Sequence, residues 1–91
     1  MTATHSRPRL RLGVALRYDH VRDRHVLLYP EGVLVLNATA ADILEHCDGA
    51  TTVTDITAAL RERYRDVQDT DILDVLTRLA DRGMIEVPTD D

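Results

Sequence analysis

The pattern of apolar residues changes its period near residue 37. Before that point, three runs rich in apolar and branched residues are typical of β-strands, over residues 14–19, 25–30 and 32–37. The segment Tyr29-Pro30-Glu31-Gly32 fits a tight turn, because proline presets φ and glycine accepts backbone angles that other residues resist. These runs predict an antiparallel meander in which the third strand lies at one edge of the sheet.

After residue 37 the apolar residues recur at helical spacing and predict three helices. Asn37 or Thr39 is expected to cap the first helix, with Asp42 completing a capping box from Thr39. Asp48-Gly49 is expected to end this helix in a left-handed conformation. Thr54 or Asp55 is then expected to begin the second helix.

The third helix is expected to run from Asp69 or Thr70 to Arg82-Gly83, and a short extended segment follows at 84–87. The predicted fold class is therefore α+β, a three-stranded antiparallel sheet followed by three helices. We expect a single domain over residues 9–87, with flexible ends at 1–8 and 88–91.

The third helix and the last two strands carry more apolar residues than a small core needs. A helix packed on one side needs an apolar stripe only about 100° wide. The apolar stripe of the predicted helix is wider than this, because it includes Ile72, Leu73, Val75, Leu76, Leu79 and Ala80. The last two predicted strands are apolar on both faces, at 26–29 and 33–36. Loop residues and arginine stems could cover this excess. Alternatively, a peptide or a second copy of the chain fills a groove between the edge strand and the third helix, because an open edge is a template for strand addition.

The residue types offer little material for catalysis, and we predict that the protein is not an enzyme and binds no cofactor or metal. The chain has no lysine, one serine and no glycine-rich phosphate loop. Its single cysteine, Cys47, lies on the apolar side of a helix end, as a structural thiol does. The four histidines lack the spacing of a zinc site, and the acidic residues from Asp66 to Asp74 lack the order of a calcium loop.

The net charge of −5 is unevenly distributed, since residues 1–30 hold six arginines and two aspartates. A winged helix-turn-helix that binds DNA needs donors at the start of its recognition helix, but the third helix begins with Asp69, Asp71 and Asp74. We therefore expect no nucleic-acid partner. The chain also lacks an apolar run of about 20 residues and an apolar secretory signal, which predicts a cytoplasmic protein without a membrane partner.

Five segments together carry a family resemblance. They are Arg-Leu-Gly-Val-Ala-Leu-Arg-Tyr-Asp, Arg-His-Val-Leu-Leu-Tyr-Pro-Glu-Gly, Val-Leu-Val-Leu-Asn-Ala-Thr-Ala-Ala-Asp-Ile-Leu, Cys-Asp-Gly and Leu-Ala-Asp-Arg-Gly, at residues 11–19, 24–32, 33–44, 47–49 and 79–83. From about residue 9 to residue 87, the chain resembles the PqqD family of peptide chaperones in pyrroloquinoline quinone biosynthesis. The resemblance implies a winged-helix-like recognition element for ribosomally made, modified peptides, known as a RiPP recognition element.

The resemblance also implies partners and a binding site. In the family, the precursor peptide PqqA adds a strand to the third strand, beside the third helix, and is presented to the radical S-adenosylmethionine enzyme PqqE. PqqE then cross-links a Glu and a Tyr of the precursor, and the iron–sulfur clusters and S-adenosylmethionine belong to that enzyme. Carried onto this chain, the peptide-binding residues are Val33, Leu34, Val35 and Leu36 on the strand, and Ile72, Leu73, Leu76 and Ala80 on the helix. The alternative is a structural module that forms a homodimer through the same edge.

Overall fold

The three-stranded sheet and the three helices form in the predicted order, so the α+β fold class is confirmed. The computed structural model describes residues 4–88. The strands are β1 (Arg9–Leu10), β2 (Ala15–Asp19), β3 (Arg24–Tyr29), β4 (Gly32–Val35) and β5 (Ile85–Glu86), and the helices are α1 (Ala38–Glu45), α2 (Val53–Leu60) and α3 (Asp69–Asp81). Among the described residues, no helix has the length and apolar character that crossing a bilayer requires.

The sheet has the order β2-β3-β4, with β3 in the centre and both pairs antiparallel. Leu27 of β3 lies opposite Leu16 of β2 on one side and Leu34 of β4 on the other. Side chains of directly opposed residues share a face, so these three leucines form one row across the sheet. This row faces the helices, and α1 is the helix that packs against β2 and β3.

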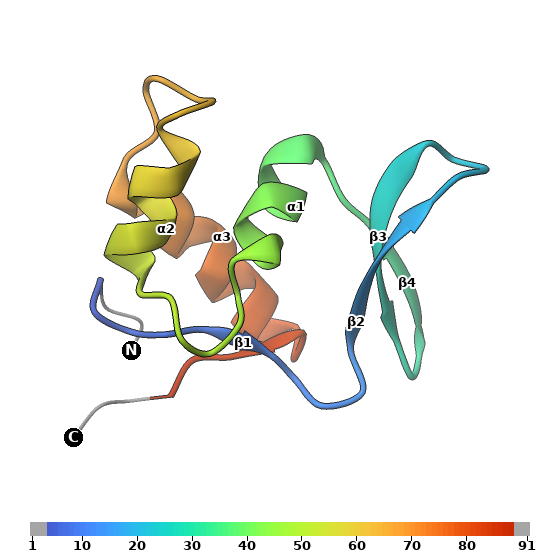
Figure 1. Cartoon of the computed structure of the whole chain (residues 1–91). Helices are drawn as coiled ribbons and strands as arrows, with labels where there is room; N and C mark the ends of the chain where they lie inside the picture. Colours follow the sequence, from blue (N-terminus) through green and yellow to red (C-terminus); the bar gives the residue numbers. More distant parts are fainter. Residues whose placement is uncertain (1–3, 89–91) are drawn as a thin grey trace.

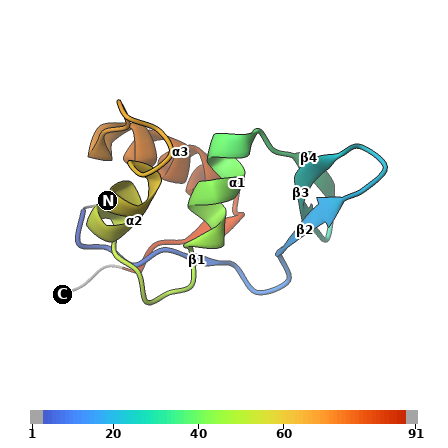
Figure 2. The same cartoon turned by 45° about the horizontal axis from the view of Figure 1, so that its top comes forward.

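Figure 1 shows the sheet at one end of the molecule, with the three helices gathered at the other. The view in Figure 2 agrees, and it shows α1 between the sheet and the other two helices. The core lies mainly among the helices and against the inner face of the sheet. Its fully buried residues include Leu27, Ile43, Leu44, Val53, Ile56, Ile72 and Leu76.

A two-stranded ribbon, β1 with β5, was not predicted from the sequence. Arg9 lies opposite Glu86 and Leu10 opposite Ile85, so the extended segment at 84–87 becomes the partner of a strand near the other end of the chain. Figure 1 shows the two strands side by side below the helices. A pair this short has too few residues for sequence alternation to reveal it.

The segment before β1 is held against the body, in contrast to the flexible end expected over residues 1–8. The side chain of Pro8 is fully buried and Ser6 is 5% exposed. The backbone N–H groups of Gly49, Val53 and Thr54 donate to carbonyls of this segment at 3.0 Å. The bonds from Val53 and Thr54 satisfy the first two N–H groups of α2, which explains why a segment without apolar periodicity is ordered. The rest of the prediction for the two ends concerns residues 1–3 and 89–91, outside the described residues, and Pro88, which is exposed.

The helix termini match the sequence analysis in part. Asn37 caps α1 as predicted, and its side chain accepts from the N–H of Ala40 at 2.8 Å. The expected end of α1 at Asp48-Gly49 was wrong, because the helix ends at Glu45 and Gly49 takes its positive φ in the following loop. The predicted start of α2 was also late, since Thr52 is the capping residue.

At α3 the predicted start at Asp69 and end at Arg82-Gly83 are confirmed. Gln68 and Asp71 form a reciprocal capping box before the first turn. The acidic residues there serve the helix N-terminus, where negative charge is favourable.

We expect the packing of residues 4–8 to be measurable in the stability of the protein. Pro8→Asp places a carboxylate in a fully buried position and should lower the free energy of unfolding by at least about 2 kcal/mol. His5→Asp changes an exposed residue of the same segment and should stay within about 0.5 kcal/mol of the original chain. Urea denaturation followed by circular dichroism compares the two. Equal midpoints for both variants would contradict the packing of this segment.

Candidate functional site

The outer edge of β4 has no partner strand among residues 4–88. The N–H of Leu36 donates to the carbonyl of His25 at 2.9 Å, which places the backbone of Leu36 toward β3. Backbone groups alternate in direction along an antiparallel strand. Leu34 therefore also bonds to β3, whereas the N–H and C=O groups of Val33 and Val35 point to the open edge.

The side chains of β4 are arranged differently from its backbone groups. Leu34 is half-buried and packs against the core, and Leu36, just after the strand, is 4% exposed. Val33 and Val35 are 47% and 44% exposed. Of the four residues predicted on this strand, only these two combine an exposed side chain with open backbone groups.

A groove of about 220 Å³ lies between β4 and α3. It is lined by Leu34, Val35, Leu36, Asn37, Ala40, Val75, Arg78, Leu79 and Arg82. Apolar side chains thus come from β4, α1 and α3, and Arg78 of α3 and Arg82, the residue that follows the helix, add positive charge. A groove between these two elements was one of the two interpretations of the apolar excess in the sequence, and the structure contains one there.

The residues of α3 that line this groove differ from those predicted. Ile72 and Leu76 are 0% exposed, because they point into the core. Leu73 and Ala80 are half-buried and pack against that core. Each of them precedes a groove residue, Val75 or Arg82, by two positions, which is about 200° around a helix. Leu73 and Ala80 therefore lie on the opposite flank of α3, and none of the four predicted helix residues lines the groove.

Val75, Leu79, Arg78 and Arg82 were missed as a site because the apolar stripe of α3 has two flanks. Sequence periodicity identifies the centre of the stripe but not which flank faces the sheet. The signal that could have found them is the pair of arginines. Arg78 and Arg82 are four residues apart, so both lie on one face of the helix, next to Val75 and Leu79.

The outer face of the sheet carries a second apolar surface. Val26 lies opposite Val35, and Leu28 lies opposite Val33, so these four side chains are neighbours on that face. Val26 is 3% exposed although it is outside the main core cluster, whereas Leu28 is 39% exposed. The excess of apolar residues noted in β3 and β4 is therefore located on the outer face.

Cys47 is the one thiol of the chain, and its environment makes it unreactive. Burial, with a smaller effect of the neighbouring Asp48 carboxylate, raises the pKa of the thiol to about 12. The Sγ atom lies 3.4 Å from the carbonyl oxygen of Ile43, to which it donates. At neutral pH the group is a protonated thiol, which agrees with the structural role predicted for it.

No group of histidine, cysteine and carboxylate side chains within residues 4–88 has the arrangement of a metal site. His20 and His25 each make an edge-to-face ring contact with Tyr18. The Nε2 atom of His25 lies 3.7 Å from a carboxylate oxygen of Glu45. These contacts join the sheet to itself and to α1.

Asp42 does not complete the capping box that was expected from Thr39. Its carboxylate accepts from the hydroxyl of Tyr64 at 2.7 Å and forms an ion pair with Arg63 at 3.2 Å. The hydrogen bond to Asp42 raises the pKa of Tyr64, because it stabilises the protonated phenol. The network ties α1 to the turn after α2.

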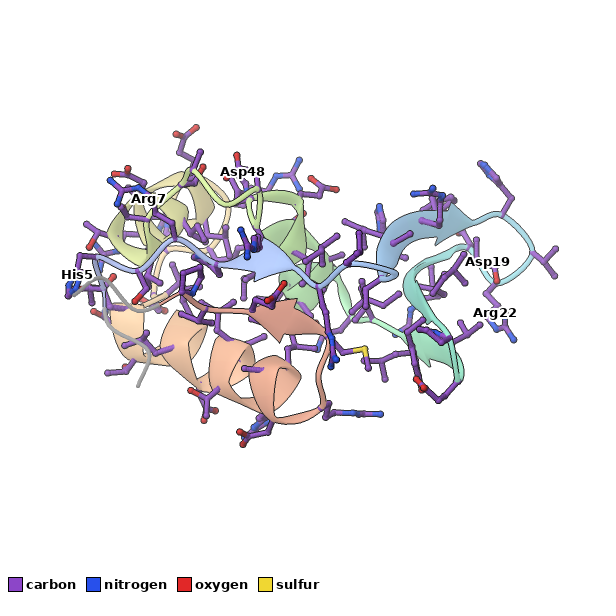
Figure 3. All side chains as sticks on the ribbon, turned by 90° about the horizontal axis from the view of Figure 1, so that it is seen from below. His5, Arg7, Asp19, Arg22 and Asp48 are labelled. Atoms are coloured by element: carbon purple, nitrogen blue, oxygen red, sulfur yellow. The ribbon has the colours of Figure 1, made fainter. Side chains whose placement is uncertain are left out.

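Asp19 and Asp48 close loops by accepting backbone N–H groups. Asp48 accepts from Ala50 and Thr51, and these bonds hold the pKa of its carboxyl below the usual value. Asp19 accepts from the N–H of Arg22 and pairs with its guanidinium, with the same effect on its pKa. Figure 3 shows Asp19 and Arg22 at the end of the sheet away from His5 and Arg7.

Comparison with known families gives a match over residues 24–85 to the family described as coenzyme PQQ synthesis protein D, PqqD. A relative named PqqA binding protein in Azotobacter vinelandii is 42% identical over 82 residues, which cover 88% of this chain and 89% of that one. A protein of the same name in Pseudomonas aeruginosa is 48% identical over 68 residues, covering 72% and 74% of the two chains.

Two solved structures share the fold. The solution structure of the PqqD part of Methylobacterium extorquens PqqCD, described as a stand-alone RiPP recognition element, superposes with a TM-score of 0.79. It is 38% identical and covers 94% of this chain and 95% of that one. Lasso peptide synthetase B1, solved in complex with a leader peptide, gives a TM-score of 0.71 at 28% identity, covering 88% and 98%.

Proline substitutions should show which residues of β4 bond to β3. Proline removes one backbone N–H, and it is tolerated at an edge only where that N–H points outward. We expect Leu34→Pro to break the bond to Leu27 and lower the melting temperature strongly. Val35→Pro should leave the melting temperature within a few degrees of the original. Circular dichroism measures both. A fold that survives Leu34→Pro and is lost with Val35→Pro would reverse the assignment.

The environment of Cys47 predicts slow reaction with thiol reagents. At pH 8 the folded protein should react with Ellman's reagent at least about 100-fold more slowly than the same protein in 6 M guanidinium chloride, where a free cysteine has a pKa near 8.5. The absorbance of the released thiolate gives both rates. Similar rates would show that the thiol is accessible and ionised in the folded protein.

Proposed function

This chain belongs to the PqqD family, and we propose that it is a peptide chaperone of pyrroloquinoline quinone biosynthesis. In this proposal it binds the precursor peptide PqqA as an added strand on β4 and presents it to the radical S-adenosylmethionine enzyme PqqE. The observation that carries the proposal is the open edge of β4, with the backbone groups of Val33 and Val35 free to pair, beside an apolar groove. The relatives named PqqA binding protein support the identity of the peptide.

Strand addition and the groove would supply different parts of the binding energy. Hydrogen bonds to the edge contribute about 0.5–1.5 kcal/mol each and depend little on the sequence of the peptide. An apolar side chain of the peptide that is buried among Leu34, Val75 and Leu79 contributes about 1.5–3 kcal/mol. The edge therefore orients the peptide and the groove selects it.

The division of labour in the proposal leaves the chemistry to PqqE. Its cross-linking reaction uses iron–sulfur clusters and S-adenosylmethionine, and the chain described above contributes binding and orientation. A peptide held as an extended strand has fewer conformations than the free peptide. Part of the conformational entropy that the reacting residues must lose is consequently lost when the peptide binds the chaperone, before it reaches the enzyme.

A homodimer formed through β4 is the second candidate function, because the same open edge fits a second copy of the strand. The two functions compete for one surface. Light scattering at increasing protein concentration, with and without PqqA, separates them. A dimer that PqqA dissociates would show that both occupy the edge, and a monomer at all concentrations would remove the second candidate.

Strand addition predicts that Val35→Pro weakens the binding of PqqA by about 5- to 30-fold, which corresponds to 1–2 kcal/mol for one lost hydrogen bond and a bent edge. Isothermal titration of the full chain with synthetic PqqA measures the affinity, and the circular dichroism spectrum confirms that the variant is folded. Val35→Ala is the matched control, because it shortens the same side chain and keeps the backbone N–H. Equal affinities of the proline and alanine variants would exclude strand addition at this position.

The two flanks of α3 predict different effects on peptide binding. Val75→Asp puts a carboxylate into the groove and should reduce affinity for PqqA at least tenfold, about 1.4 kcal/mol. Leu73→Asp is the matched variant on the other flank, and it should change the affinity of the folded protein less than threefold. The reverse order of the two affinities would place the peptide on the flank of Leu73 and Ala80.

A further inference from the structure

Arg82 lies where two hollows of the surface meet. It lines the groove between β4 and α3, and it also lines a second cavity of about 200 Å³. That cavity is enclosed by the linker between β1 and β2, the turn between β3 and β4, and the end of α3. Its lining residues are Arg11, Leu12, Val14, Tyr29, Pro30, Glu31, Arg82, Gly83 and Met84.

The position of Gly83 shows how close Arg11 is to the end of α3. Gly83 has a φ of +76°, and a Cβ placed on it would lie only 3.0 Å from the Nη1 atom of Arg11. The guanidinium of Arg11 therefore rests against the backbone of the residue that follows Arg82. Two arginines thus line one cavity, Arg11 from the linker before β2 and Arg82, the residue that caps the C-terminus of α3.

The charges around this cavity are unbalanced. Within residues 4–88, neither Arg11 nor Arg82 forms an ion pair, whereas Arg78 is paired with Asp74 at 3.1 Å. The described residues that line the groove include no carboxylate, and Glu31 is the one acidic residue that lines the cavity. This excess of positive charge occurs in a chain whose net charge is −5.

We propose that Arg11 and Arg82 form a carboxylate-binding subsite at the turn end of the groove. A peptide lying along β4 would place an aspartate or glutamate side chain, or its terminal carboxylate, in this cavity. The inference rests on the proposed function and adds to it a charge requirement and a position along the peptide. An arginine fork matches the geometry of a carboxylate, and each such bond is stronger than one between neutral groups.

The position also fixes the register of the bound peptide. Arg82 follows α3 close to the turn at Pro30 and Glu31, whereas Val75 and Asn37 line the groove elsewhere along its length. An acidic residue of the peptide would then bind in the cavity at the turn end, and an apolar residue would bind in the groove beside Val75. Strand pairing alone cannot distinguish registers that differ by two residues, because such shifts keep each side chain on its own face.

The test is titration of the full chain with synthetic PqqA of the source organism, followed by fluorescence anisotropy at low and high salt. Arg82→Gln and Arg11→Gln should each lower the affinity about 3- to 10-fold, and the loss should shrink at high salt. Arg65→Gln removes the same charge from an exposed residue that lines neither hollow, and it should change the affinity less than twofold. Glu31→Gln should have the opposite sign and raise the affinity.

Peptide variants identify which carboxylate is bound. Each acidic residue of PqqA is replaced in turn by its amide, and one further peptide carries a C-terminal amide. One of these changes should reproduce the loss seen with Arg82→Gln, and combining it with Arg82→Gln should add little further loss. Proton–nitrogen NMR of the arginine side chains should show the Nε–H signal of Arg82 shifting when PqqA is added. The signal should not shift when the peptide variant that reproduces the loss is added.

The outcomes separate the inference from the function on which it rests. If the original chain does not bind PqqA, the proposed function fails and the subsite fails with it. If the original chain binds PqqA and both arginine variants bind as tightly as Arg65→Gln, the subsite is excluded and the proposed function stands. Losses that no single peptide substitution reproduces would show a general charge effect and would also overturn the subsite.

Discussion

The row of Leu16, Leu27 and Leu34 across the sheet is the contact on which the candidate site depends. Leu27 is completely buried, and it lies between the other two leucines in the centre of the sheet. This row fixes the inner face of the sheet against the helical body, and thereby sets the distance between β4 and α3. With the inner residues of β4 committed to the fold, Val33 and Val35 retain open backbone groups.

The separation of folding and binding along β4 is a consequence of alternation in a strand. Successive residues direct their backbone groups to opposite edges, and their side chains to opposite faces. Leu34 uses both for the fold, since its backbone bonds to β3 and its side chain packs against the core. The backbone groups of Val33 and Val35 point to the open edge, and their side chains remain about half exposed. A strand of four residues can therefore hold the sheet together and still offer a surface for a partner.

The sequence predicted the elements of this fold well, because their signals are local. Asn37, Pro30 and Gly83 mark a helix start, a turn and a helix end through their own backbone preferences. The ribbon of β1 with β5 was not predicted, since its two strands are short and lie more than seventy residues apart. Likewise, the burial of Pro8 depends on neighbours in space that no local pattern shows.

The candidate site was predicted in outline and not in detail. The edge strand followed from the order of the strands, and the groove from the excess of apolar residues. Which flank of α3 faces β4 depends on the rotation of the helix about its axis, and that rotation is set by packing of Ile72 and Leu76 into the core. A residue two positions along, such as Leu73 instead of Val75, then lies on the other side of the helix.

An open edge strand is a hazard for aggregation, and the position of β4 limits it. The strand is four residues long, and it lies between the tight turn at Pro30 and the cap of α1 at Asn37, so few backbone groups are open to a passing strand. Self-pairing of two β4 edges would bring together two surfaces that each carry Arg78 and Arg82, and like charges disfavour such an approach. An acidic peptide meets the opposite condition. Under the proposed function, the charge of the groove therefore favours binding of an acidic peptide over self-pairing of the edge.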